Sequence, residues 1–374
     1  MSKKNKVAIA SWSLQDGLNY GCSLQSAGMQ KLIWDCGYKP ITIYNLFIPT
    51  PSDRKLLGNR GKYLLFRGCK YLRTKYRFLR YATKYIRLSK ICYTDWEIVK
   101  YIKKKCDILL CGSDSIWRAD LICPLFLWDY EELDLYPRIS YAPSIQSGDL
   151  IYENLNQAIN RFDFLSGREA NVAEFLKKYT DKSVEIVLDP TLAVDETFWE
   201  RQVRGYRLIK EDYVLCYFLS EAEMHRLAVN QIKKKYNVKR IVYINTNYID
   251  KWLGFTDYRG EDYPHIVGPR EFLSLIKYSK AVCTDSFHGM AFSIVFRKAF
   301  FMFGRDLRWA QGADYRTKNL FDQLQIGNRM VYTNKDIKTL KPINWDIVEK
   351  NLLAERKKSV NYLQHALDEC SKKI

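Results

Sequence analysis

The sequence predicts an α/β protein built from two Rossmann-like domains. Short apolar segments alternate with helical stretches in the first half, the same pattern recurs in the second half, and a charged stretch separates the two. Such alternation favours a largely parallel sheet with helices on both faces. At 374 residues the chain is long enough for two cores of ordinary size. We predict an N-terminal domain over 1–200, a C-terminal domain over 211–340 and a C-terminal amphipathic helix over 341–374.

The first half opens with a predicted strand at Lys6–Ser11 and a helix at Gly21–Cys36, which Gly37 terminates. A strand at Pro40–Tyr44 is followed by a long basic helical region. Further strands are predicted at Asp107–Cys111, Arg138–Ala142, Phe162–Ser166 and Val184–Leu188, with a helix at Asn171–Lys178. Pro190 and the charged stretch to Lys210 are predicted to form the linker.

The second half repeats the pattern. Strands are predicted at Tyr213–Phe218, Arg240–Ile244, Ala281–Thr284 and Arg297–Phe303, and helices at Glu221–Tyr236 and Pro269–Tyr278. The tail from Trp345 to Cys370 places its apolar residues near one stripe, which is typical of an amphipathic helix.

The composition is that of an ordinary globular protein, with 47% hydrophobic and 27% charged residues. The sequence contains no run of 18 apolar residues, so we expect a cytoplasmic protein without a membrane span or a secretory signal. The ten cysteines form no CxxC pair and no cluster with histidine. We therefore expect no metal site and no disulfide framework, and we interpret Cys111, Cys216 and Cys283 as small hydrophobic residues of buried strands.

The net charge of +18 is concentrated in one segment. Between Arg54 and Lys90 there are 13 Lys or Arg residues and no acid, and aromatic residues are interspersed among them. Apolar residues recur at helical spacing, which predicts a basic helix with a single apolar stripe. The residues of this stripe are Leu72, Tyr76, Leu79, Ala82 and Ile86.

Three interpretations of the 54–90 segment stay open. The helix can dock by its stripe and remain solvated elsewhere, it can lie on an anionic membrane surface, or it can bind nucleic acid. Nothing else in the chain resembles a nucleic-acid module, so we expect no nucleic-acid partner.

The most informative stretch runs from Ser279 to Gly304. It predicts the buried strand Ala281–Thr284, a polar corner with Asp285, Ser286 and His288, and an apolar helix that begins near Gly289. In α/β folds this junction is a common ligand site, because the helix N-terminus attracts anions. An imidazole there can exchange a proton with a bound phosphate or carboxylate. The simpler alternative is a helix cap beside a histidine packed in the core.

The other three histidines are weaker candidates. His225 lies in a charged helical stretch and is predicted to be exposed. His265 belongs to a loop that would flank the cleft between the domains, and His365 is predicted to be structural in the tail helix.

Seven segments in order resemble the polysaccharide pyruvyl transferase family. They are Asn19-Tyr20-Gly21 with Leu24-Gln25, CDILLCGSDSIW (Cys106–Trp117), RISYAPSIQSG (Arg138–Gly148), LSGRE (Leu165–Glu169), VLDPTL (Val187–Leu192), YVLCYFLS (Tyr213–Ser220) and GPREFLSLIKYSKAVCTDSFHG, which ends at Gly289. The resemblance covers most of the chain. It implies a GT-B-like architecture in which the two Rossmann-like domains face one another across a cleft.

The resemblance also implies an activity. The donor would be phosphoenolpyruvate, the acceptor a saccharide that is either free or linked to a lipid carrier, and the product a pyruvate ketal destined for a capsule, an exopolysaccharide or a cell-wall glycan. No further cofactor is implied. Some members carry an arginine two residues before the histidine, where this chain has Ser286, so another cation must then hold the donor.

Site residues follow from the same resemblance. His288 is the candidate acid. Candidates for donor binding are Arg168 in the N-terminal domain and Ser286, Gly289, Arg270 and Arg305 in the C-terminal domain. Asn19, Tyr20, Ser113 and Asp114 are candidates for acceptor binding in the N-terminal domain. Arg168 could instead pair with Glu169, Asp114 could form an Asx turn, and Asp189 is predicted to be a turn residue.

Two other functions are compatible with the sequence. One is a GT-B glycosyltransferase that uses a nucleotide sugar, which would share the two-domain cleft. The other is a non-catalytic basic protein that binds an anionic polymer or a membrane surface through residues 54–90.

Overall fold

The computed structural model describes residues 5–12, 18–45, 64–117, 122–145, 152–219, 225–245, 266–304, 315–333 and 335–374. The chain forms two compact units. The first consists of Met1–Leu64, Phe78–Val194 and Leu353–Ile374, and the second of Leu65–Arg77 and Asp195–Leu352. The chain therefore passes between the units within the basic helix, after Val194 and within the C-terminal helix.

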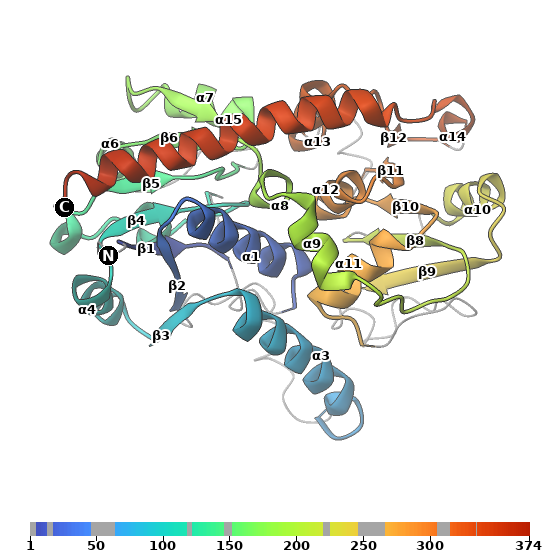
Figure 1. The fold of residues 1–374 in the computed structure, drawn as a ribbon, viewed down its shortest axis with the longest axis horizontal. Helices are drawn as coiled ribbons and strands as arrows, with labels where there is room; N and C mark the ends of the chain where they lie inside the picture. The colour runs from blue at the N-terminus through green and yellow to red at the C-terminus, as the bar shows by residue number, and fades with distance from the viewer. Residues whose placement is uncertain are drawn as a thin grey trace. The chain divides into compact units, whose positions relative to one another are not determined.

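The first unit contains a five-stranded parallel sheet in the order β3-β2-β1-β4-β5 (Figure 1). The strands are β1 (Lys6–Ala10), β2 (Lys39–Asn45), β3 (Leu88–Cys92), β4 (Ile108–Cys111) and β5 (Arg138–Ser140). A bridge between Ile139 and Phe164 connects β5 with the two-stranded sheet of β6 (Leu165–Gly167) and β7 (Val184–Ile186). The order 3-2-1-4-5 is that of the Rossmann fold, and it reverses direction between β1 and β4.

Local sequence explains these elements. The central strands β1 and β4 are almost entirely apolar and buried, as expected for parallel strands covered on both faces. Helix α1 (Tyr20–Asp35) begins after Asn19, whose side chain accepts a hydrogen bond from the Cys22 N–H. Helix α4 (Asp95–Lys105) has Thr94 as its cap, acids in its first turn and lysines in its last, which match the helix dipole.

The other helices assigned wholly to the first unit are short, and α3 (Leu64–Tyr85) is shared with the second unit. The short ones are α5 (Pro124–Leu127), α6 (Leu155–Asn160), α7 (Ala170–Leu176) and α8 (Pro190–Ala193). A 3-10 turn spans Glu131–Leu133.

The second unit contains another five-stranded parallel sheet, in the order β12-β11-β10-β8-β9. Its strands are β8 (Tyr213–Phe218), β9 (Arg240–Asn245), β10 (Ala281–Thr284), β11 (Ala299–Phe303) and β12 (Met330–Val331). In chain order this is 2-1-3-4-5, the other common doubly wound arrangement, and its direction reverses between β8 and β10.

Helices of the second unit pack on both faces of its sheet. They are α9 (Glu196–Val203), α10 (Arg226–Lys235), α11 (Pro269–Lys277), α12 (Phe287–Val295), α13 (Tyr315–Leu324) and α14 (Asp336–Thr339). Val229 and Ile232 of α10 join a core with Cys216, Cys283 and Phe301 on one face. On the other face, Phe272 of α11 packs against Tyr217 and Phe292.

The expected linker at 190–210 is wrong in its first part, because residues 190–203 form α8 and α9. Asp189 and Asp195 each cap a helix by accepting a backbone N–H bond, and Pro190 occupies the first turn of α8. Trp199 of α9 is fully buried. Glu196, Glu200 and Arg201 lie on the amphipathic helix α9, so these charges do not mark an open connection.

The basic helix differs from its prediction in two ways. It ends at Tyr85, and Leu88–Cys92 and Asp95–Lys105 form β3 and α4, neither of which was expected. The predicted single stripe is divided, because Ala82 and Ile86 are buried whereas Leu72, Tyr76 and Leu79 are 61%, 62% and 38% exposed. Residues 54–63 lie outside the described part of the chain.

Helix α15 (Trp345–Ser371) confirms the predicted tail helix. Its residues from Leu353 onward belong to the first unit, where several side chains hydrogen-bond to main-chain groups. Ser359 Oγ accepts from the Leu188 N–H at 2.8 Å, Tyr362 donates to the Ser140 carbonyl at 2.9 Å, and Arg356 Nε donates to the Leu192 carbonyl at 2.7 Å.

The described cysteines are free, and Cys111, Cys216 and Cys283 are buried in β4, β8 and β10. Among the helices that the structure describes, none combines the length and the apolar character needed to cross a bilayer.

Candidate functional site

The turn between β10 and α12 places Asp285, Ser286 and His288 at the carboxyl edge of the second sheet. Helix α12 begins at Phe287, two residues before the predicted start, and Ser286 is its N-cap with an Oγ–Gly289 N distance of 3.5 Å. All three polar side chains are almost buried, with 2%, 3% and 6% of their surface exposed. The first turn of α12 therefore presents its positive dipole end at this corner.

Gly289 is required by the close approach of α12 to the end of β10. A Cβ atom at this position would lie 2.4 Å from Thr284 Oγ1. Thr284 Oγ1 cannot easily move, because it donates to the Tyr217 carbonyl at 2.7 Å and accepts from the Ser286 N–H at 3.0 Å. The glycine thus allows the helix start to sit directly against the strand end.

Asp285 connects the two strands between which the sheet order reverses. Its Oδ1 accepts a hydrogen bond from the Leu219 N–H at 2.7 Å, and Leu219 directly follows β8. Because ligands of doubly wound sheets bind at this reversal, the corner occupies the expected ligand position of the second unit. His288, the second residue of α12, lies at that position with its ring edge-on to Phe287.

Of the two arginines predicted to supply an additional cation for the donor, the structure describes Arg270. Arg270, at the start of α11, donates from Nε to the Gln202 carbonyl at 2.8 Å and lies 3.9 Å from the centre of the Tyr206 ring. Both contacts are within the second unit and hold the guanidinium in place. Arg305 lies outside the described residues, as does His265.

A second polar cluster occupies the carboxyl edge of the first sheet, where its strand order reverses between β1 and β4. Ser113 and Asp114 follow β4, and Ser113 is fully buried. Ser113 Oγ donates to Asp189 Oδ2 at 3.1 Å. Gly112 permits this turn, because its φ is +133° and a Cβ there would lie 1.9 Å from the Tyr141 carbonyl oxygen.

Arg168 lies at the centre of this cluster and contacts three carboxylates. Its Nε donates to Glu169 Oε1 at 2.7 Å, and its Nη1 donates to Asp189 Oδ2 at 2.9 Å and to Asp114 Oδ1 at 3.3 Å. Burial alone would lower the pKa of Arg168, but the carboxylates of Glu169, Asp114 and Asp189 outweigh it and raise the pKa. The guanidinium is thus a permanent cation within a group of acids.

Exposure distinguishes Asp114 from the other acids. Its side chain is 15% exposed, whereas the side chains of Glu169 and Asp189 are 2% and 0% exposed. Asp114 has a φ of +68°, and its Oδ2 is 3.8 Å from Cys22 Sγ. It is therefore the acid of this cluster that an external molecule can reach most easily.

Asn19 and Tyr20 contribute to the start of α1. Asn19 caps the helix, and the fully buried Tyr20 packs against Phe78 with ring centres 5.3 Å apart. Gln25 of the same helix donates to Ser11 Oγ and to the Trp12 carbonyl at 2.7 Å each, and accepts from the Ser113 N–H at 3.3 Å. Gln25 thus links the ends of β1 and β4.

Sequence reasoning missed part of both clusters. Asp189 does cap α8, as a turn residue would, but it also contacts Arg168 and Ser113, a role that only the fold brings about. His225 was expected to be exposed and is not: only 9% of it is exposed, and its ring packs between Phe218 and Phe303 at 4.9 and 4.7 Å. His365 packs edge-on against Phe164, in the structural position expected.

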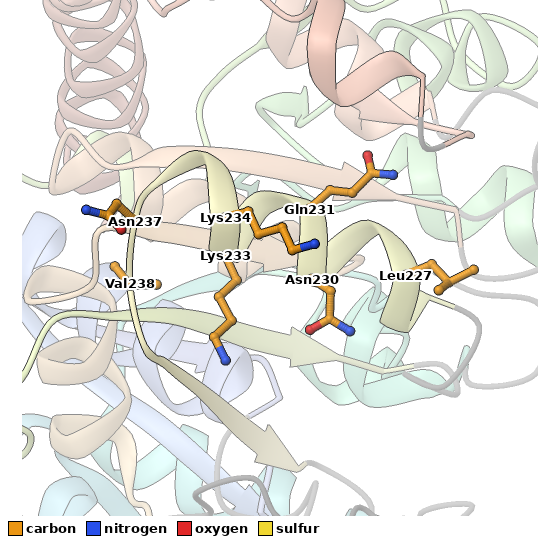
Figure 2. A pocket seen from close by; sticks show the side chains of 7 residues that line it. All are labelled: Leu227, Asn230, Gln231, Lys233, Lys234, Asn237 and Val238. Carbon is orange, nitrogen blue, oxygen red and sulfur yellow. The ribbon is translucent and has the colours of Figure 1, made fainter.

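Figure 2 shows a hollow on the outer side of α10, away from both clusters. Asn230, Gln231, Lys233 and Lys234 line it together with residues of the turn that follows the helix. That turn leads into the amino end of β9, so the hollow is not at the carboxyl edge where His288 lies. Within the described ranges, no three His, Cys, Asp or Glu side chains gather as metal ligands would.

Comparisons with known proteins agree with this architecture. The sequence model of the family described as polysaccharide pyruvyl transferase matches residues 19–306. No curated protein matches the chain significantly.

Solved structures show similarity of fold. A variant of the wall teichoic acid polymerase TagF aligns with 12% identity over 99% of this chain and 90% of its own, with a TM-score of 0.52. A UDP-GlcNAc 2-epimerase from Neisseria meningitidis, bound to UDP-GlcNAc, aligns with 8% identity over 100% of both chains, with a TM-score of 0.51. At these identities the likeness establishes a GT-B-like fold.

Proposed function

Because the chain belongs to the polysaccharide pyruvyl transferase family, we propose that it transfers pyruvate from phosphoenolpyruvate to a saccharide and forms a ketal in the synthesis of a surface polysaccharide. The observation that carries this proposal is the histidine corner at the strand-order reversal of the second sheet, inside the stretch that the family model matches. A small, highly charged anion is the type of ligand that such a helix start favours.

The reaction defines what the protein must supply. C3 of phosphoenolpyruvate gains a proton, positive charge develops at C2, and a sugar hydroxyl attacks C2 and releases its proton. A second hydroxyl then forms the other C–O bond at C2 while the C2–O bond to phosphate breaks, and its proton leaves with the phosphate. The site needs a proton donor for C3, groups that bind two anionic moieties, and an acceptor for the hydroxyl proton.

His288 is the proposed acid, because a bound anion beside it favours the protonated imidazole. The start of α12, from Ser286 to Gly289, would bind the phosphate or carboxylate through its backbone N–H groups. Arg270 and Arg305 stay candidates for the additional cation.

The first cluster is the proposed acceptor site. Asp114, whose side chain is partly exposed, is the proposed acceptor of a sugar hydroxyl proton, and its contact with Arg168 holds the carboxylate in position. Ser113, Asn19 and Tyr20 would shape the surface around it. Direct donor binding by Arg168 stays a prediction, since its guanidinium already contacts three carboxylates.

Helix α3 suggests that the acceptor is presented at an anionic membrane. Its exposed apolar residues Leu72, Tyr76 and Leu79 lie on one face, and the neighbouring Arg73, Lys75 and Arg80 are exposed cations. Apolar side chains beside cations are typical of a helix that lies in a lipid interface, and each cation near an anionic surface contributes about 1 kcal/mol.

Vesicle sedimentation tests this contact. The protein should bind vesicles that contain phosphatidylglycerol and not vesicles of phosphatidylcholine alone. Leu72→Ser with Leu79→Ser should abolish binding, whereas Leu227→Ser, at an exposed leucine of α10, should not. Equal binding by the double variant and the unaltered protein would refute the contact.

The fold also favours a second candidate, a glycosyltransferase that uses a nucleotide sugar. The polymerase and the epimerase with similar folds were solved with CDPG and UDP-GlcNAc, respectively. A nucleotide-binding enzyme would need a pocket for a base and a ribose in addition to an anion site.

A thermal-shift titration separates the candidates, because a ligand that binds only the folded protein raises the melting temperature. Phosphoenolpyruvate should raise it, and His288→Ala should abolish both this shift and turnover while the protein still folds. A shift with nucleotide diphosphates alone would favour the glycosyltransferase. Full activity of the His288→Ala variant would remove His288 from the mechanism and leave the non-catalytic basic protein as the alternative.

A further inference from the structure

His225 lies at the carboxyl edge of the second sheet, next to the end of β10. Its ring packs against Phe218, the last residue of β8, and Phe303, the last residue of β11. Because β10 pairs with both of these strands in parallel, the imidazole bridges the carboxyl edge of the sheet across the position where β10 ends.

His225 and His288 approach this edge from opposite faces of the sheet. Phe218 and Phe303 belong to the core that the sheet shares with Val229 and Ile232 of α10, so His225 is on the α10 face. Helix α12 packs on the other face through Phe292, which contacts Phe272 and Trp199. A ligand over the end of β10 would therefore have one histidine on each side.

One ring nitrogen of His225 lacks a hydrogen-bond partner in the described part of the chain. This nitrogen, Nε2, is buried. An unsatisfied buried nitrogen of this kind costs about 1–3 kcal/mol, so it requires an explanation such as a bound ion, an ordered water or a catalytic role. Burial lowers the pKa of His225, and the carboxylate of Asp285 partly opposes this effect.

We propose that His225 is a second anion-binding histidine of the donor site, whose Nε2 hydrogen-bonds a phosphate oxygen of a ligand bound over the end of β10. This proposal rests on the proposed function only in taking phosphoenolpyruvate as the ligand in the cell. Any phosphate-bearing ligand at this edge would engage the same nitrogen.

The test compares His225→Phe with the unaltered protein, using inorganic phosphate and phosphoenolpyruvate as probes in calorimetric titrations. Phenylalanine preserves the packing between Phe218 and Phe303 but removes the nitrogen, so the melting temperature should stay equal or rise. The affinity for both probes should fall at least tenfold. His365→Phe, which changes a histidine packed on Phe164 in the first unit, should leave the affinity unchanged.

The outcomes separate this proposal from the proposed function. Tenfold weaker phosphate binding by His225→Phe supports the anion-binding role of His225, whether or not phosphoenolpyruvate binds. If phosphate binds and phosphoenolpyruvate does not, only the assignment of phosphoenolpyruvate as the donor is refuted. Unchanged affinity in His225→Phe, or no phosphate binding by the unaltered protein, overturns the role of His225.

A measurement on the native side chain covers the case in which His225→Phe does not fold. The chain has 4 histidines, so the imidazole nitrogen resonances of the labelled protein can be assigned by comparison with the ligand-free spectra of His265→Ala, His288→Ala and His365→Phe. A shift of the remaining resonance, that of His225, when phosphate is added to the unaltered protein supports the proposal. If His288 accounts for the only shift, the proposal is wrong.

Discussion

Replacing Arg168 with alanine should destabilise the first unit strongly, independently of any role in catalysis. The side chain of Arg168 is 3% exposed, and its guanidinium contacts carboxylates at 2.7, 2.9 and 3.3 Å. Its removal would leave Glu169 and Asp189 buried without their cation. Breaking a buried ion pair in this way typically costs about 3–5 kcal/mol.

The expected shift in melting temperature follows from the size of the unit. For a unit of roughly 200 residues, 1 kcal/mol corresponds to about 2–4 °C, so the transition of the first unit should fall by roughly 6–20 °C. Differential scanning calorimetry measures this shift. The control is Arg87→Ala, because Arg87 also belongs to the first unit but is exposed.

If Arg168→Ala melts within 2 °C of Arg87→Ala, the difference is less than about 1 kcal/mol and the reasoning is refuted, since 1 kcal/mol corresponds to about 2–4 °C. It would mean that the acids tolerate the loss of their cation, through solvent entry or protonation. The same instability affects how an activity assay of Arg168→Ala is interpreted. Loss of turnover in Arg168→Ala cannot by itself assign donor binding, because loss of the folded first unit would have the same effect.

Three further predictions concern stability. Gly289→Ala should cost about 1–3 kcal/mol in urea unfolding, because the added Cβ would lie 2.4 Å from Thr284 Oγ1; an unchanged midpoint would show that α12 can shift. Gln25→Met should cost about 1–3 kcal/mol, because the Trp12 carbonyl and the Ser113 N–H lose their partner, and wild-type stability would contradict the role of Gln25 as a link between strand ends. Burial raises the pKa of Cys106 from 9.0 to about 12. The free energy of unfolding should therefore be constant below pH 9 and decline between pH 9 and 12, where the thiol ionises only in the unfolded protein. At pH 10 the expected loss is about 1.4 kcal/mol, and it should be absent in Cys106→Ala.

The sequence predicts the central strands well, because their residues are buried on both faces and leave a continuous apolar signal. β4, β8 and β10 lie where their runs of Ile, Leu, Val and Cys indicate. β3 was missed because Leu88–Cys92 has the exposed residues Lys90 and Ile91 at the sheet edge and follows a basic helix. α8 was missed because it begins with Pro190, and α9 because its charges resemble those of a linker. Capping by Asp189 and Asp195 and the burial of Trp199 explain both helices.

The candidate site was predictable where a motif and a strand end coincide. Ser286, His288 and Gly289 form a contiguous motif, so their placement at the start of α12 follows from local sequence. Asp189 and Gln25 join the first cluster only through pairing of distant strands, and neither has a chemical signature of its own. His225 was misjudged because its charged neighbours suggested exposure, whereas long-range packing against Phe218 and Phe303 buries it.

The contribution of α15 to the first unit has a consequence for protein synthesis. About 160 residues separate Val194 from Leu353, and the hydrogen bonds of Arg356, Ser359 and Tyr362 can form only after this stretch has been translated. At about 5–20 residues per second, the nascent first unit waits roughly 8–32 s for its last helix. During that time the surface that α15 covers is open to chaperones and proteases, so a premature stop codon before Leu353 would damage the unit encoded first.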